Sequence, residues 1–224
     1  MPLTPRLYHW FVRPKWLTKK YIHDHINGHF DLSDGNVLDF GAGTGANCTI
    51  CKPESNLGIE PDAKRIGLAK KLYPNHRFIE FDTKRISVPD NSIDTILVIA
   101  VLHHIPDEQI KAYLREFERI LKPNGKIVAI EPYLCQRTRF NNRFMNWYDD
   151  GDYIRYEDGY LNLFKNAEYD FQVLKRFKKC FVYNELFFHA APKSKSSPSF
   201  SRFASADEDE MAITGNTIYG LGPD

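Results

Sequence analysis

Five short apolar runs recur between residues 36 and 132, each separated from the next by a more polar segment. They are NVLDF (36–40), NLGIE (56–60), RFIEF (77–81), IDTILVIAVL (93–102) and KIVAIEP (126–132). The run 93–102 is the most apolar, which predicts a central strand buried on both faces. Between the last two runs, one helical face carries Ile110, Leu114, Phe117 and Leu121, and the helix should end at Pro123-Asn124-Gly125. Repeated alternation of strand and helix predicts right-handed βαβ units and a parallel sheet.

The chain of 224 residues suits one α/β domain with additional segments. Residues 1–34 should form an N-terminal helical segment over the active site, with Pro14 near the start of its helix. The main domain is expected over 35–192. Within it, 171–177 and 182–190 are strand candidates close enough to pair as a hairpin at a sheet edge. Residues 193–224 are rich in serine and acids, which predicts a disordered tail.

Bulk composition excludes several classes of protein. The formal net charge is +1, so no overall field favours nucleic acid. No apolar run is long enough to span a bilayer, and the N-terminus lacks the pattern of a signal peptide. Four cysteines in a chain of this length do not indicate a disulfide scaffold, so a cytoplasmic location is expected. Cys48 and Cys51 match half of a zinc knuckle or a redox pair, but no second pair follows, so no metal is predicted.

A glycine-rich turn follows the first apolar run, in the segment VLDFGAGTGAN. Glycine lets the backbone approach a ligand without a Cβ in the way. In a doubly wound sheet this turn lies at the carboxyl end of the first strand, where ligands bind. By itself the pattern also fits a tight turn in any α/β protein.

Acidic residues at the ends of the second and third runs strengthen the ligand hypothesis. Nineteen positions separate Gly41 from Glu60, and an acid at about that distance can accept hydrogen bonds from ribose hydroxyls. Asp82 follows the third run at the same sheet edge. Two structural alternatives stay open: Glu60 can cap the helix that begins near Pro61, and Asp82 can cap a turn. The order of glycine turn, first acid and second acid favours a nucleoside cofactor.

The turn has neither the glycine spacing of a dinucleotide site nor the lysine of a phosphate-binding loop. The segments VLDFGAGTGAN, LGIEPD, FDTKRISVPDNSIDTILVIAVLHHIPD and ERILKPNGKIVAIEP together resemble the class I S-adenosylmethionine-dependent methyltransferases. The resemblance covers roughly residues 36–132 and is greatest to the small-molecule group that includes the ubiquinone and menaquinone C-methyltransferases. It implies a doubly wound, mostly parallel, seven-stranded Rossmann-like sheet with an antiparallel last strand. In one respect the chain departs from the family, because only ten residues, ANCTICKPES, separate Gly45 from the second run, so the first helix should be short.

The resemblance also implies a role for each matching residue. The methionine part of S-adenosylmethionine would lie on Gly41, Ala42 and Gly43, and Asp39 would hold its amino group directly or through water. Glu60 would bind the ribose. The remaining cofactor-binding positions are Pro61, Asp82 and Thr83 around the adenine, and Ala100 and Val101 beneath the sulfonium.

Candidates for chemistry and for acceptor binding follow the fourth and fifth runs. His103 or His104 can act as a base near neutral pH, or can simply hold the loop. Residues 133–164 occupy the position of an acceptor-site insertion, although a surface subdomain is an equal alternative. Its basic candidates for pairing with an anionic group are Arg137, Arg139, Arg143 and Arg155, and its aromatic candidates are Trp147, Tyr148, Tyr153 and Tyr156.

Three functional hypotheses follow from these features. The first is methyl transfer to a small-molecule acceptor or biosynthetic intermediate. The second is methyl transfer to a lipid-linked or quinone-like acceptor at a membrane surface, because LYHWFVRPKWLTKKYI is basic and aromatic and can lie weakly at an interface. The third is a non-catalytic module that binds the cofactor or a partner. No feature of the sequence indicates an oligomeric state.

Overall fold

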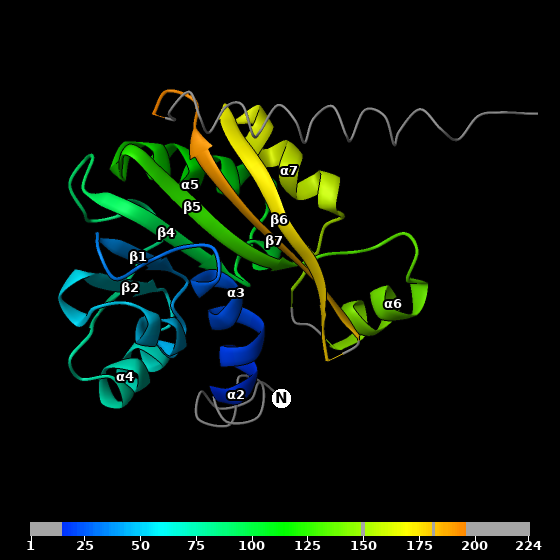
Figure 1. Cartoon of the computed structure of the whole chain (residues 1–224), viewed down its shortest axis with the longest axis horizontal. Helices are drawn as coiled ribbons and strands as arrows, with labels where there is room; N and C mark the ends of the chain where they lie inside the picture. The colour runs from blue at the N-terminus through cyan, green and yellow to red at the C-terminus, as the bar shows by residue number, and fades with distance from the viewer. Residues whose placement is uncertain (1–14, 149–150, 181, 196–224) are drawn as a thin grey trace, which may run out of the picture.

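The computed structural model describes residues 15–148, 151–180 and 182–195. A seven-stranded sheet with the order β3-β2-β1-β4-β5-β7-β6 runs through the molecule (Figure 1). Its strands are β1 (Val37–Phe40), β2 (Asn56–Glu60), β3 (Arg77–Glu80), β4 (Ile93–Ile99), β5 (Leu121–Pro132), β6 (Tyr169–Lys179) and β7 (Tyr183–Pro192). Strands β1 to β5 pair in parallel, whereas β7 pairs antiparallel with both β5 and β6. The predicted fold class, including the terminal hairpin, is therefore confirmed.

Helices cover both faces of this sheet. The helical segments are α2 (Lys15–Thr18), the π-helical turn η2 (Lys19–His23), α3 (Asp24–Asn27), α4 (Ala63–Leu72), the 3₁₀ turn η5 (Leu102–His104), α5 (Asp107–Ile120), α6 (Arg139–Tyr148) and α7 (Glu157–Asn166). Helix α5 buries Ile110, Leu114 and Phe117 at helical spacing, as its sequence pattern predicts. They join one large core with α7 and one face of the sheet, while Ile22 and Ile26 of η2 and α3 pack in a second cluster against the other face.

The segment between β1 and β2 is short and contains no α-helix. Two 3₁₀ turns, η3 (Ala46–Ile50) and η4 (Pro53–Ser55), connect the strands. The predicted short first helix is thus present as a 3₁₀ turn. Helix α6 was not expected from the sequence, because its apolar residues are mixed with arginine and asparagine.

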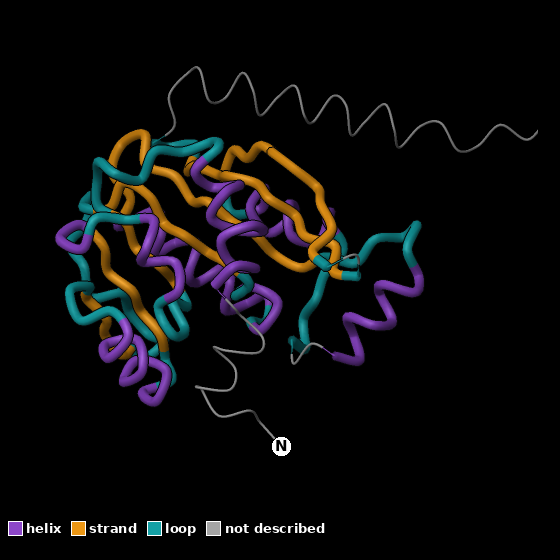
Figure 2. Tube along the Cα trace, turned by 60° about the horizontal axis from the view of Figure 1, so that its bottom comes forward, coloured by secondary structure: helices purple, strands orange, loops and turns teal. Residues whose placement is uncertain are grey.

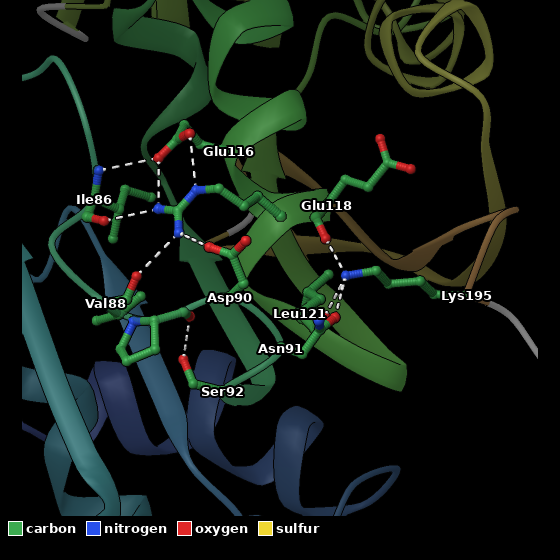
Figure 3. A network of polar contacts seen from close by, with 11 residues as sticks. Ile86, Val88, Asp90, Asn91, Ser92, Glu116, Glu118, Leu121 and Lys195 are labelled. Atoms are coloured by element: carbon green, nitrogen blue, oxygen red, sulfur yellow. Dashed lines mark hydrogen bonds and ion pairs between the residues drawn. The ribbon is translucent and has the colours of Figure 1, made fainter.

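The beginning of the predicted tail has defined contacts. The Lys195 ammonium donates to Asn91 Oδ1 at 2.7 Å and to the carbonyl oxygen of Leu121 at 2.6 Å (Figure 3). The backbone N–H of Asn124 donates to the Lys195 carbonyl oxygen. The rest of the predicted tail, 196–224, and most of the predicted N-terminal segment, 1–14, lie outside the described residues.

Within the described ranges, every helix is either too short or too polar to cross a lipid bilayer.

Candidate cofactor site at the carboxyl ends of the strands

The glycine turn after β1 leaves open space at one position only. Gly41, Gly43 and Gly45 all have positive φ, between 55° and 83°. A Cβ at Gly41 would lie 2.6 Å from Val101 Cγ2, and one at Gly45 would lie 2.7 Å from Phe78, so packing accounts for these two glycines. A Cβ at Gly43 would meet nothing within 4 Å. The space beside Gly43 is therefore available to a ligand, and the turn fits a cofactor that approaches its backbone closely.

Glu60 holds this turn in place from the end of β2. Its side chain is buried, and Oε2 accepts from the Gly43 N–H at 3.0 Å while Oε1 accepts from the Asp62 N–H at 3.2 Å. The N-cap of α4 is Asp62, whose Oδ1 accepts from Lys64 and Arg65 N–H groups. A carboxylate has about four acceptor positions, so Glu60 retains capacity for about two more donors after these two bonds.

Asp39 lies within β1, where it pairs with Gly58 of β2, and it is buried beside η3. Asn47 Nδ2 donates to its Oδ1 at 3.2 Å. Cys48 and Cys51 are buried free thiols close to the same carboxylate. Burial first, and the Asp39 charge second, raise the pKa of both thiols to about 12, so both stay protonated at neutral pH. No group of three or more metal-binding side chains occurs among the residues that the structure describes, and these two thiols have the chemistry of packing residues.

The third acid lies in an exposed turn after β3. Asp82 Oδ1 accepts from the Lys84 N–H at 3.1 Å, and Thr83 has a φ of 62°. The turn-cap alternative for Asp82 is thus realised in the structure, and the carboxylate stays exposed beside it. Tyr113 of α5 donates through its hydroxyl to the Thr83 carbonyl oxygen at 3.4 Å.

The loop that follows this turn is fixed to α5 by one arginine. The Arg119 guanidinium donates to the carbonyl oxygens of Ile86 and Val88, at 2.9 and 3.0 Å, and pairs with Asp90 and Glu116 (Figure 3). A planar guanidinium with five donors can satisfy several acceptors of one loop at once. The position of the Asp82 turn is therefore set by contacts on both sides.

A buried glutamate of β5 organises the loop after β4. Glu131 is fully buried, and its Oε1 accepts from the N–H groups of Val101 and Leu102, at 2.8 and 2.9 Å. Its Oε2 lies 2.9 Å from His103 Nδ1. Ala100, directly before this loop, has a φ of 55°, an uncommon conformation for a residue with a Cβ. The carboxylate and the alanine with positive φ together fix this segment, which the family resemblance predicts to lie beneath the sulfonium.

His103 and His104 differ in their surroundings. His103 is buried and bound to Glu131, whereas His104 is exposed, with its ring centroid 4.0 Å from that of His103. Both lie in the loop directly after β4, and the contact of His103 with Glu131 fits the alternative in which a histidine holds this loop. Sequence reasoning missed Glu131, although an acid directly after the buried run KIVAI was a possible signal.

Part of the insertion is tied to the same loop. Arg155 donates to the carbonyl oxygens of Leu102 and Ile105, at 2.9 and 2.7 Å, and its Nε donates to Asp107 at 2.9 Å. The Tyr153 N–H donates to the His103 carbonyl oxygen at 2.9 Å. Tyr153 is therefore close to the loop after β4, residues 100–104, here called the candidate methyl-transfer loop. Arg155 is a structural clamp whose donors are used within the chain.

The other acceptor candidates are exposed. Arg137, Arg139 and Arg143 are exposed, and Trp147 has 80% of its surface accessible. Tyr156 is exposed, and the Tyr148 side chain lies outside the described residues. Helix α6 stands away from the sheet in both views (Figures 1 and 2). The structure thus brings Tyr153 to the loop and leaves the arginines and Trp147 on a separate exposed surface.

A second buried acid, also missed from the sequence, lies on β7 opposite Pro132. Glu185 is buried, its Oε1 is 3.5 Å from Lys179 Nζ, and its Oε2 has no hydrogen-bond partner within the described structure. Desolvation raises the pKa of this carboxyl, and the Lys179 ammonium opposes the rise only in part.

The order of this sheet is that of the class I S-adenosylmethionine-dependent methyltransferases, with a hairpin at its end, a glycine turn after β1, and acids at the ends of the next two strands. Comparison with known proteins agrees. Residues 18–173, well over half of the chain, match the family model described as a methyltransferase domain, and the chain belongs to this family.

Curated relatives are also described as methyltransferases. The chain is 34% identical over 126 residues to an uncharacterized methyltransferase of Bacillus cytotoxicus, and 36% identical over 123 residues to one of Bacillus mycoides. These alignments cover 55% and 54% of this chain. The chain spans only 57% and 56% of the length of these relatives.

Solved structures share the fold. A SAM-dependent methyltransferase from Aquifex aeolicus superposes with a TM-score of 0.63 at 14% identity, over 84% of this chain and 99% of that one. Human N-acetylserotonin methyltransferase, solved with SAM, gives a TM-score of 0.55 at 23% identity, over 73% of this chain and 49% of that one. The family and these fold relatives support S-adenosylmethionine as the cofactor.

Proposed function

We propose that this chain transfers a methyl group from S-adenosylmethionine to a small-molecule acceptor. The observation that carries the proposal is the Glu60 carboxylate, which is buried, bound to the glycine turn, and left with acceptor capacity beside the open space at Gly43. A ribose with two hydroxyl donors has the complementary chemistry.

S-adenosylmethionine supplies a methyl group on a positively charged sulfur. Gly41, Ala42 and Gly43 would line its methionine part, with Asp39 near the amino group. Glu60 would accept from the ribose hydroxyls, Pro61 would lie near the adenine, and Asp82 with Thr83 would meet its amino edge. Ala100 and Val101, at the start of the loop that Glu131 holds by its Val101 N–H, would lie beneath the sulfonium.

Alignment of acceptor and methyl group supplies most of the rate in such a displacement, and a base is needed only when the acceptor must lose a proton. His103 and His104 are the proposed bases for that case. The acceptor we propose is a ring-bearing or quinone-like compound. This is supported by the motifs PDNSID and LHHIPD, which resemble those of the ubiquinone and menaquinone C-methyltransferases, and by Tyr153 beside the loop.

Calorimetric titration tests the cofactor assignment. We expect S-adenosylmethionine and S-adenosylhomocysteine to bind and NAD not to bind. NAD binding without S-adenosylhomocysteine binding refutes the proposal. Turnover is then followed as S-adenosylhomocysteine release with small hydroquinone and phenol acceptors. A protein that binds the cofactor but never releases product with any acceptor class is the non-catalytic module.

A further inference from the structure

Helix α6 carries an exposed aromatic stripe that the methyltransferase core does not use. Phe140, Phe144 and Trp147 recur at helical spacing. Phe140 and Trp147 have 73% and 80% of their surface accessible, whereas Met145 on the other side of the helix is completely buried. Phe144 contacts both Trp147 and Tyr183, with ring centroids 6.4 and 6.0 Å apart, and so anchors the stripe to the body of the protein.

Three unpaired cations lie on this helix and in the turn directly before it. Arg137, Arg139 and Arg143 are exposed, and none has an ion-pair partner within the described ranges. The segment 132–148 contains no acidic residue, and the acids Asp149 and Asp150 follow only after the last residue of the helix. The surface formed by Arg137, Arg139, Phe140, Arg143 and Trp147, here called the α6 surface, therefore combines positive charge with large apolar side chains.

The position of α6 makes this surface accessible to a large flat partner. The helix follows the carboxyl end of β5, where Glu131 holds the candidate methyl-transfer loop, and it projects beyond the sheet in both views (Figures 1 and 2). Asn142 secures its first turn by a reciprocal pair of hydrogen bonds with the backbone of Cys135, both 2.9 Å long. The projecting helix is thus held in a defined place beside the site.

The size of the α6 surface argues against a protein partner. A helix of 10 residues is about 15 Å long and roughly 10 Å wide, so one face of it covers on the order of 150 Å². A standard protein interface buries roughly 800 Å² on each partner. Exposed aromatic side chains next to arginines are instead typical of a helix at a membrane–water interface. There tryptophan favours the level of the lipid headgroups, and arginine pairs with lipid phosphate.

We propose that the α6 surface docks on an anionic phospholipid membrane and so presents the adjacent loop to acceptors dissolved in the bilayer. The membrane contact does not depend on methyl transfer, because it is made by residues outside the cofactor site. It differs from a contact through the N-terminal segment, since it requires α6.

The test is co-sedimentation of the full chain with vesicles of phosphatidylcholine alone or mixed with phosphatidylglycerol, at low and at physiological salt. We expect binding only to the anionic vesicles, weakening as salt rises. The variant R137Q/R139Q/R143Q should bind on the order of 100-fold more weakly, because each of the three basic side chains near the surface contributes a factor of about five.

The matched control is K64Q/K70Q/K71Q on α4, which removes the same charge from exposed lysines elsewhere and should keep the binding. The pair F140S/W147S should lose binding, whereas L72S, which replaces an exposed leucine of α4, should not. In a background with Trp10 and Trp16 changed to Phe, the emission of Trp147 should shift to the blue on binding. Melting curves of every variant verify that it is folded.

Several results would overturn the proposal. The proposal fails if the parent protein does not bind anionic vesicles at low salt, or if the α4 variants lose as much binding as the α6 variants. It also fails if Trp147 emission does not change on addition of vesicles. Concentration-dependent dimers that disappear in F140S/W147S, without vesicle binding, would instead make the α6 surface a contact between copies of the chain.

Discussion

Replacing Glu60 with Gln tests the cofactor site most directly. The substitution keeps the shape but turns one acceptor oxygen into a donor group. In the structure the two oxygens accept from the Gly43 and Asp62 N–H groups, so the new amide must face one of these donors. We expect the free energy of unfolding to fall by about 1–2 kcal/mol, which corresponds to a melting temperature lower by about 2–8 °C. Cofactor affinity should fall by about 1.5–3 kcal/mol, or roughly 10- to 150-fold, because bonds to a charged acceptor are lost.

Titration calorimetry with S-adenosylhomocysteine, together with thermal unfolding, separates these two effects. The control is Glu80→Gln, which makes the same charge change at the exposed end of the neighbouring strand and should change neither quantity. A lower melting temperature with unchanged affinity would show that Glu60 only holds the glycine turn. Unchanged values for both would contradict the hydrogen bonds themselves.

Three further predictions follow from the structure. Gly41→Ala should lower the melting temperature more than Gly43→Ala does, because both substitutions strain a positive φ but only a Cβ at position 41 would also contact Val101. Gly43→Ala should lower cofactor affinity because its Cβ would fill the open space, and an unchanged affinity would contradict the use of that space by the cofactor. Glu185 has a raised pKa in the folded chain, so the free energy of unfolding should fall as the pH rises from the pKa of the unfolded chain through that of the folded chain. In urea unfolding between pH 4 and 8, Glu185→Gln should remove this fall, and parallel curves for the parent and the variant would contradict burial of the carboxylate. Truncation after Lys195 should leave the melting temperature within about 2 °C, since the composition of 196–224 predicts little burial of apolar surface. Truncation after Lys193 should lower it further because the Lys195 contacts are lost, and equal melting temperatures would show that those contacts contribute nothing.

The sequence predicted the strands well because their signals are local. The run 93–102 is apolar at nearly every position, and its strand lies at the centre of the sheet, buried along its length. The ends of the strands differ from the predicted ends by a few residues. Strand pairing continues into residues that are polar and so give no apolar signal in the sequence. Strand β5 begins at Leu121 and not at Lys126, because Leu121 pairs with Ile93 across a bulge.

Helix α6 shows where local signals fail. Its apolar side chains face away from the core at Phe140 and Trp147, so no stripe pointed to a buried face. Trp147 and Tyr153 belong to one insertion in the sequence. In the structure Tyr153 contacts the loop after β4, whereas Trp147 lies on a separate exposed surface.

The sequence by itself determined the sheet, its order of acids and glycines, and the family, because each rests on residue types at fixed spacing along the chain. Only the tertiary structure decided what the buried acids do. Glu131 and Glu60 bind backbone N–H groups of segments that are 28 to 30 and 17 positions away. These partners depend on how the strand ends pack against one another, so they cannot be predicted from the separation of the residues in the sequence. For the same reason only the structure distinguishes the three glycines of the turn. Val101 and Phe78 occupy the space where a Cβ of Gly41 and of Gly45 would lie, whereas the space beside Gly43 is open.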